Sequence, residues 1–211
     1  MTASSIEALP EPLLRRVAAQ ALTRTFPKNA VIVTEGDESD SLYILLAGRA
    51  KVYVSGEGDR EFYLNQLKPG EYFGEVRLDG GPRSASVIAL EECRCAILKG
   101  ADLSRALAEH PDFALHVIRK LAHLVRALTE SARSLALMDV YGRVAALLLK
   151  LAEERDGQLE IRERLTQREI AARVGASREM VSRILKDLES GGYLSVERER
   201  IAIHRKPPKR W

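Results

Sequence analysis

The stretch Leu165-Thr-Gln-Arg-Glu-Ile-Ala-Ala-Arg-Val-Gly-Ala-Ser-Arg-Glu-Met-Val-Ser-Arg-Ile-Leu185 decides the fold of the C-terminal part of this 211-residue chain. Thr166 and Glu169 have the spacing of a capping box, in which each side chain satisfies a backbone N–H of the other residue. The helix that follows is expected to end at Gly175, since glycine readily takes the left-handed conformation. Ser177 then caps a second helix. Four apolar residues recur on it at helical spacing and predict a buried stripe: Val181, Ile184, Leu185 and Leu188.

The opposite face of the second helix is polar and carries Arg178, Glu179, Ser182, Arg183 and Lys186. Gly191 and Gly192 then turn the chain into two alternating segments, 193–196 and 201–204, which predict a hairpin. A short helix, a glycine turn, a helix with one arginine-rich face and a hairpin are the pattern of a winged helix-turn-helix. A charged helix face is more commonly just solvated. We prefer DNA binding because the cap, the turn, the stripe and the hairpin occur together.

The chemistry of the polar face suits DNA. Arg donates two hydrogen bonds to guanine O6 and N7, and Glu accepts one from cytosine N4. Arg178, Glu179 and Arg183 span about 140° of arc at roughly 100° per residue, so that one groove can meet all three. The predicted DNA-contacting set also contains Thr166, Gln167, Ser177, Lys186 and Arg198.

The excess of positive charge is in the same part of the chain. The net charge is +3, yet residues 139–211 hold 16 basic and 12 acidic side chains and the rest of the chain 17 and 18. This asymmetry predicts two domains with different partners. Lys186, Arg198 and Arg200 are expected to contact phosphates, which position a protein without specifying a sequence. We expect the basic tail, residues 205–211, to be a flexible end that could add phosphate contacts.

Residues 26–100 have a different sequence pattern, in which short apolar segments alternate with glycine. Strands are expected at residues 31–34, 41–47, 50–54 and 62–67, with two more within 84–98. Closely spaced short strands of this kind indicate a β sandwich or jelly roll. Cys93 and Cys95 share one face of the last strand, where we expect them to pack as small apolar residues.

Several classes of protein are excluded by what the sequence lacks. Two cysteines cannot form a four-ligand zinc or iron–sulfur site, and the first half of the chain has no histidine. A jelly-roll enzyme of the cupin type would need a His/Glu metal cluster on its strands, so we predict no catalytic residues, no metal and no enzyme activity. No apolar run approaches roughly 18 residues, and residues 1–10 do not resemble a secretory signal. We therefore expect a cytoplasmic protein without a membrane partner.

Residues 111–137 have the period of a helix with a heptad seam. The a and d positions are Ile118, Leu121, Val125, Leu128, Ala132 and Leu135. Branched residues at the first two a positions favour a parallel two-stranded coiled coil, and hence a homodimer. The alternative is an amphipathic helix that packs on its own domain. Asp139 is expected to cap another helix through Leu151, with Asp156-Gly157 as its end.

This order of elements resembles the CRP/FNR family of bacterial transcription regulators, over roughly residues 12–205. The resemblance implies an α+β chain in three parts. Residues 1–110 would form a cyclic-nucleotide-binding-like β jelly roll, residues 111–138 a dimerisation helix, and residues 139–211 a winged helix-turn-helix. The run 165–185 is close to the family's DNA-reading signature. It implies that Arg178, Glu179 and Arg183 read a TGTGA-type half-site, and Asp139 is the matching hinge residue.

Phe73-Gly-Glu75 and Pro82-Arg-Ser-Ala85 are similar to the family's phosphate-binding cassette. The resemblance implies that Gly74 and Glu75 hold a ribose and that Arg83 and Ser84 hold a cyclic phosphate. A carboxylate accepts from a 2′-hydroxyl, and Arg with nearby backbone N–H groups neutralises a phosphate. The alternative is a structural turn in which the Glu and the Arg merely pair. The intervening loop is one residue shorter than the common family form and carries Arg77.

On the dimer helix, the family's purine-contacting hydroxyl pair aligns with Leu128-Thr129, so that only Thr129 keeps a hydroxyl. Cyclic AMP (cAMP) is the ligand we expect first. Control by cyclic di-GMP and activity without any nucleotide are the alternatives, and a nucleotide-sensing adaptor that binds no DNA is a more distant one. RNA polymerase is an expected partner by resemblance. The sequence leaves open the effector, the sign of regulation, the target genes and the polymerase contact.

Overall fold

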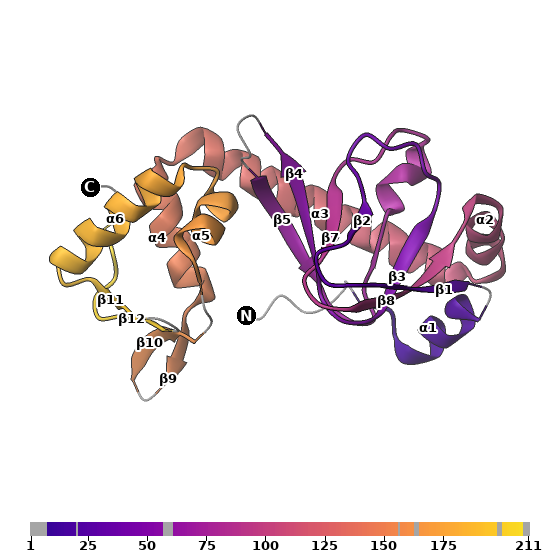
Figure 1. Cartoon of the computed structure of the whole chain (residues 1–211), viewed down its shortest axis with the longest axis horizontal. Coiled ribbons are helices and arrows are strands. Elements are labelled where there is room, and N and C mark those ends of the chain that lie inside the picture. The colour runs from indigo at the N-terminus through magenta and orange to yellow at the C-terminus, as the bar shows by residue number, and fades with distance from the viewer. Residues whose placement is uncertain are drawn as a thin grey trace. The chain divides into compact units, whose positions relative to one another are not determined.

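A computed structural model of the chain describes residues 8–19, 21–56, 61–155, 157–162, 165–197 and 200–208 (Figure 1). The chain divides into two compact units, Met1–Leu128 and Thr129–Trp211. The first unit is built on β strands, and the second consists of helices with a small sheet. The prediction of an α+β chain with a β-rich first part, a long helix and a winged helix-turn-helix is confirmed.

Two four-stranded antiparallel sheets form the body of the first unit. One has the strand order β1 (Leu22–Phe26), β8 (Cys93–Leu98), β3 (Leu42–Ala47) and β6 (Tyr72–Phe73). The other has the order β2 (Val31–Val33), β7 (Ser86–Ala89), β4 (Ala50–Ser55) and β5 (Glu61–Leu67). Every segment expected to be a strand is one. Strands β1 and β6 were not predicted, nor was the 3₁₀ helix η1 (Glu75–Asp79).

The core of this β sandwich lies between its sheets. It contains Phe26, Val33, Leu45, Phe73 and Val87 together with both cysteines. Cys93 and Cys95 are fully buried on β8, as the alternation of the strand predicts, and burial raises the pKa of both thiols. The two cysteines therefore act as core residues of the sandwich.

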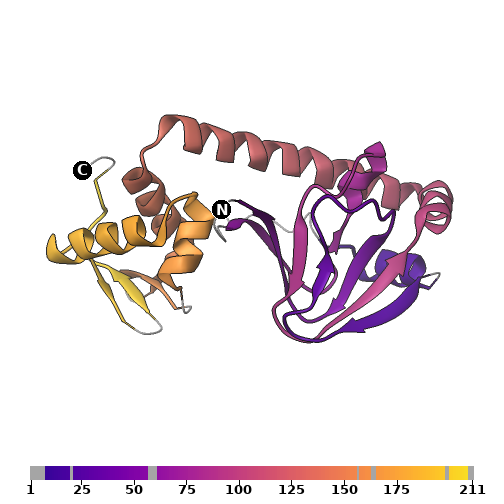
Figure 2. The same ribbon diagram turned by 45° about the horizontal axis from the view of Figure 1, so that its top comes forward.

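Three helices accompany the strands, and two of them were not predicted: α1 (Glu11–Ala18) and α2 (Gly100–Glu109). The third, α3 (Pro111–Leu137), covers the expected range as one continuous helix (Figure 2). Its inward face buries Phe113, Val117 and Lys120. Four seam residues, Ile118, Val125, Leu128 and Leu135, are instead 45–63% exposed. The helix thus packs on its own unit through one face, which includes the seam residue Leu121, whereas the other four lie outside that contact.

The second unit begins with α4 (Val140–Leu151), which Asp139 caps by accepting a hydrogen bond from the Gly142 amide at 2.7 Å. The prediction that Asp156-Gly157 ends this helix is wrong. The helix stops at Leu151, and the chain then forms a hairpin of β9 (Glu153–Arg155) and β10 (Gln158–Ile161). Gly157, with φ 77°, lies in the hairpin turn, and Asp156 lies outside the described residues.

The remaining elements are α5 (Gln167–Val174), α6 (Arg178–Ser190), β11 (Leu194–Val196) and β12 (Ile201–Ile203). The last two strands join the earlier hairpin in a sheet of order β11-β12-β10-β9. The predicted wing is therefore confirmed, but as part of a larger sheet. One core unites the three helices and this sheet, and its fully buried members include Val144, Leu148, Ile161, Ile170, Val181 and Leu188.

The basic tail begins as an ordered segment. The Arg205 guanidinium donates to the Gly191 carbonyl at 2.6 Å and lies 5.0 Å from the centroid of the Tyr193 ring. Pro207, two residues later, is buried. The expectation of a flexible end is therefore wrong at Arg205, because carbonyls at the end of α6 attract a cation there. Residues 209–211 lie outside the described part of the chain.

Candidate functional site

The turn between α5 and α6 has the local geometry that its residue types predict. The Thr166 hydroxyl accepts from the Glu169 amide at 3.2 Å, and the Glu169 carboxylate accepts from the Thr166 amide at 2.7 Å. Gly175 is left-handed, with φ 64° and ψ 50°. Ser177 caps α6 by accepting from the Met180 amide at 3.2 Å. Thr166 and Ser177 therefore serve as helix caps, which fixes how the two helices meet.

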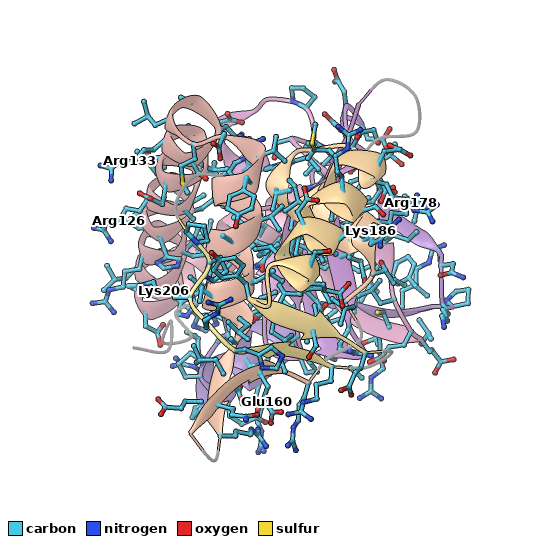
Figure 3. All side chains as sticks on the ribbon, turned by 90° about the vertical axis from the view of Figure 1, so that its left-hand side faces the viewer. Arg126, Arg133, Glu160, Arg178, Lys186 and Lys206 are labelled. Carbon is cyan, nitrogen blue, oxygen red and sulfur yellow. The ribbon has the colours of Figure 1, made fainter. Side chains whose placement is uncertain are left out.

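Helix α6 separates an apolar face from a charged one. Val181, Ile184, Leu185 and Leu188 are at most 6% exposed, so the predicted stripe is confirmed. Arg178, Glu179, Arg183 and Lys186 are exposed. Figure 3 shows Arg178 and Lys186 pointing outward, on the side of α6 away from α4.

A shallow surface hollow of about 450 Å³ lies along this charged face. It is lined by Gln167, Arg178, Glu179, Ser182, Arg183 and Lys186. Five of these are in the predicted DNA-contacting set, and Ser182 is an addition from the same face. Three of the six side chains carry positive charge against one negative charge, so the hollow suits an anionic, hydrogen-bonding partner. Of the other three members of the set, Thr166 and Ser177 are the helix caps, and Arg198 lies outside the described residues.

Arg200 is tied to the wing sheet by an ion pair. Its Nε lies 2.7 Å from Oε2 of Glu160, and the Arg162 Nε lies 2.5 Å from Oε1 of the same carboxylate. Glu160, labelled in Figure 3, is only 3% exposed. A buried carboxylate needs cationic partners, because water no longer solvates it. The Nε of Arg200 therefore serves the wing sheet, and the expected phosphate contact of this residue stays a prediction.

Arg143 joins the hinge to the helix-turn-helix. Its Nη1 donates to the Met138 carbonyl at 2.8 Å, just after α3. Its Nε donates to the Val174 carbonyl at 2.8 Å, and Nη2 lies 3.4 Å from the Gly175 carbonyl. The sequence analysis missed this role, although an arginine four residues after a helix cap is the signal that could have suggested it.

The structure brings Gly74 and Arg83 of the predicted cassette together. The Arg83 guanidinium is buried and donates to the Gly74 carbonyl at 3.2 Å, the Ser41 carbonyl at 2.5 Å and the Ser39 hydroxyl at 3.0 Å. Gly74 has φ 93°, and a Cβ there would lie 2.5 Å from Nη1 of Arg83. Glycine is therefore required for Arg83 to reach the cassette backbone.

Glu75 is buried beside the same turn, and its ion-pair partner is Lys120 of α3, at 3.3 Å. This contact differs from the Glu–Arg pair considered as the structural alternative. Lys120 was not among the predicted site residues. The available signal was its place on the inward face of α3, seven residues after Phe113.

Other predicted ligand residues are exposed or belong to the other unit. Ser84 is exposed at the start of the segment that leads into β7. Thr129 is exposed on α3 and belongs to the second compact unit. The Arg77 side chain lies outside the described residues, although its backbone is part of η1.

Among the described residues there is no cluster of three or more His, Cys, Asp or Glu side chains that could hold a metal ion. Over the same residues, no helix combines the length and the apolar character that a membrane span requires.

Comparison with known proteins gives a consistent result. Residues 23–110 match the cyclic nucleotide-binding domain, and residues 142–207 match the Crp-like helix-turn-helix domain. The CRP-like cAMP-activated global transcriptional regulator of Mycobacterium tuberculosis is 34% identical over 84% of this chain and 82% of its own length.

Solved structures show the same fold. The catabolite activator protein of Thermus thermophilus is 30% identical, with a TM-score of 0.57, over 94% of this chain and 92% of that one. The cyclic di-GMP-responsive global regulator CLP of Xanthomonas campestris has a TM-score of 0.80 over 92% of this chain and 99% of that one. At 24% identity, the second likeness concerns the fold alone.

Proposed function

The chain belongs to the CRP/FNR family of transcription regulators, and from that premise we propose that it is a cytoplasmic homodimer that reads a TGTGA-type palindromic operator under the control of cAMP. Like its relatives, it is a DNA-binding regulator and not an enzyme. Within this proposal, residues 1–110 form the sensor, residues 111–138 the dimerisation helix and residues 139–211 the reader.

The observation that carries the proposal is the charged face of α6. Arg178, Glu179 and Arg183 line one hollow on an exposed helix face whose other side is fixed in the core. A helix presented in this way enters the major groove and reads base edges there. Gln167 and Lys186 lie beside the three readers, and Thr166, Ser177 and Arg198 complete the proposed contacts to the DNA backbone.

The two faces of α3 support the homodimer. Its inward face is already buried in its own unit, whereas Ile118, Val125, Leu128 and Leu135 remain exposed. Large apolar side chains in a row on a helix gain stability when a partner covers them. We propose that this partner is a second copy of the chain, and that the two helices form a parallel coiled coil. Two recognition helices about 34 Å apart would then match one turn of DNA and require a near-palindromic site.

We assign cAMP to the turn that contains Gly74 and Glu75, with Arg83 and Ser84 at the phosphate and Thr129 at the purine. The match of residues 23–110 to the cyclic nucleotide-binding domain supports this, as does the cAMP-activated relative. Cyclic di-GMP is the second candidate, because the cyclic di-GMP-responsive regulator has the same fold. Activity without nucleotide is the third, since Arg83 already has three acceptors from the protein.

The proposed control passes through the hinge. A ligand shifts a regulator only by its difference in affinity for two arrangements of the chain. We place the change at Asp139 and Arg143, which hold the start of α4 and the turn of the helix-turn-helix. RNA polymerase is the partner proposed for the DNA-bound dimer.

Fluorescence anisotropy tests the proposal with a labelled TGTGA…TCACA duplex and a scrambled duplex of equal length, both measured at the same salt concentration. Titrations are run without nucleotide and with cAMP, cyclic GMP or cyclic di-GMP, and calorimetry on the same protein measures the binding of each nucleotide. We expect tighter binding to the palindrome and a further gain with cAMP. Equal affinity for both duplexes under every condition would refute the proposed reader, whereas a gain with another nucleotide would replace only the effector.

A further inference from the structure

The inward face of α3 packs into the core of the first unit, and part of it contacts the first residue of β6. Phe113 and His116 both touch Tyr72, the first residue of β6. The Phe113 ring meets the Tyr72 ring edge-on with centroids 6.0 Å apart, and the Tyr72 hydroxyl lies 3.0 Å from His116 Nδ1. The chain reaches Gly74 and Glu75 two and three residues after Tyr72, so α3 packs directly against the strand that leads into the cassette.

Lys120, one helical turn after His116, continues this contact into the cassette itself. Its Nζ lies 3.3 Å from Oε1 of Glu75, with the two side chains only 11% and 8% exposed. The same Nζ donates to the Tyr72 carbonyl and lies 4.0 Å from the centroid of the Tyr72 ring. Three different groups therefore hold the ammonium in one place.

The burial of this pair has a consequence for Glu75. A carboxylate removed from water must be neutralised, and Lys120 supplies the opposite charge at a fixed position. The ion pair is made by Oε1, and a carboxylate has lone pairs to accept further donors at Oε2. The contact with Lys120 therefore leaves acceptor capacity on Glu75 for a hydroxyl donor, whereas an aliphatic C–H offers the carboxylate no hydrogen bond.

We propose that Lys120 is a positioning residue that makes the cassette selective for a ligand with a ribose 2′-hydroxyl, by holding the Glu75 carboxylate buried, charged and aimed as an acceptor. The inference rests on the proposed function, because it concerns the ligand of the same site. It adds a residue of α3 to the cassette that the resemblance did not supply, and it gives that residue a part in the recognition of the 2′-hydroxyl.

Calorimetry with cAMP and 2′-deoxy-cAMP tests the proposal on the full chain. The variants are Lys120→Met, Lys120→Arg and the control Arg119→Met, which removes a positive charge from an exposed neighbour on the same helix. A hydrogen bond to a charged group is a strong one. We therefore expect the wild type to bind cAMP about tenfold or more tightly than 2′-deoxy-cAMP. Lys120→Met is expected to reduce this ratio to about twofold or less, mainly by weakening cAMP, whereas Lys120→Arg and Arg119→Met retain it.

Three results would overturn the inference. A wild-type preference that survives in Lys120→Met would remove the role of the lysine, and an equal loss for both nucleotides would reduce that role to structural support. A wild-type protein that binds neither nucleotide would refute the proposed effector, and the inference with it, so the two failures are distinguishable. If Lys120→Met does not fold, Lys120→Gln replaces it, because a shorter, uncharged amide keeps hydrogen-bond donors beside the Tyr72 carbonyl.

Discussion

Arg143 donates its Nε hydrogen to the Val174 carbonyl oxygen at 2.8 Å, and this bond joins the first turn of α4 to the last residue of α5. The same guanidinium donates to the Met138 carbonyl, which follows α3. Carbonyls at helix C-termini lack intrahelical partners and carry partial negative charge. One cation therefore satisfies the ends of two helices and links the hinge to the turn before the recognition helix.

Replacement of Arg143 by Gln should weaken operator binding by about tenfold, because the turn that sets α6 loses charge-assisted hydrogen bonds worth roughly 1.5–3 kcal/mol each. Anisotropy titrations over a range of salt concentrations measure this. The slope of log affinity against log salt should stay unchanged, since Arg143 is assigned no phosphate. A slope reduced by about one would show that Arg143 contacts DNA directly.

Arg183→Ala and Lys186→Ala should differ in kind. Loss of a base-reading arginine should cost roughly 1–3 kcal/mol and relax the preference at one base position, whereas loss of a phosphate contact should weaken all sequences alike and lower the salt slope by about one. A panel of duplexes with single base changes separates the two. Arg94→Ala, which removes one exposed charge from β8, is the matched control and should alter neither property.

Gly74→Ala should destabilise the first unit by more than Gly80→Ala. Both glycines have positive φ, of 93° and 85°, so the backbone strain is comparable. A Cβ at Gly74 would lie 2.5 Å from Arg83 Nη1 and 2.8 Å from the Ser41 carbonyl, whereas a Cβ at Gly80 has nothing within 4 Å. Thermal unfolding of the two variants measures the difference, expected at about 1–3 kcal/mol. Equal unfolding midpoints would show that the residues around buried Arg83 accommodate the added methyl group without a loss of stability.

His116 should make the first unit less stable in acid. Burial lowers its pKa, with a further contribution from nearby Lys120 and Arg119, whereas the Ala8 carbonyl opposes the shift. A histidine whose pKa is lower in the folded state stabilises the fold at pH values above its unfolded pKa of about 6.5. That contribution is lost as the pH falls from there through the folded pKa. Unfolding of wild type, His116→Gln and the control His204→Gln at pH 7.5 and 5.5 checks this, and only His116→Gln should reduce the pH dependence.

Val125→Asp should dissociate the proposed dimer, because it places a charge in the exposed apolar row of α3, where Val125 is 63% exposed in the single chain. Ala127→Asp adds the same charge two residues away, outside the heptad seam, and is the matched control. Sedimentation velocity at micromolar concentration reads the oligomeric state. Identical behaviour of the two variants would argue against α3 as the dimer contact.

The sequence predicted well those local features that are determined by residues close together in the chain. The Thr166 and Ser177 caps, the left-handed Gly175 and the stripe from Val181 to Leu188 depend on spacing within one or two helical turns, and all are present. The Asp139 cap is of the same kind.

What the sequence did not predict depends on distant partners. Residues 153–155, with the sequence Glu-Glu-Arg, read as the exposed end of a helix and become a strand only because β10 pairs with them. Strand β1 has four exposed residues out of five, so it lacks an alternating pattern, and it forms by pairing with β8. A lysine on an amphipathic helix is normally solvated. The burial of Lys120 follows from Glu75, which lies far away in the chain.

The division of α6 into two faces also bears on how regulators of this kind diversify. No side chain that anchors the helix in the core belongs to the charged hollow, and no side chain of the hollow is needed in the core. Substitutions at the proposed base readers Arg178, Glu179 and Arg183 should therefore cost little stability, because exposed positions away from packing contacts tolerate exchange. On the proposed function, a few such surface mutations would give gene copies separate regulons, and they would redirect the protein to a new promoter.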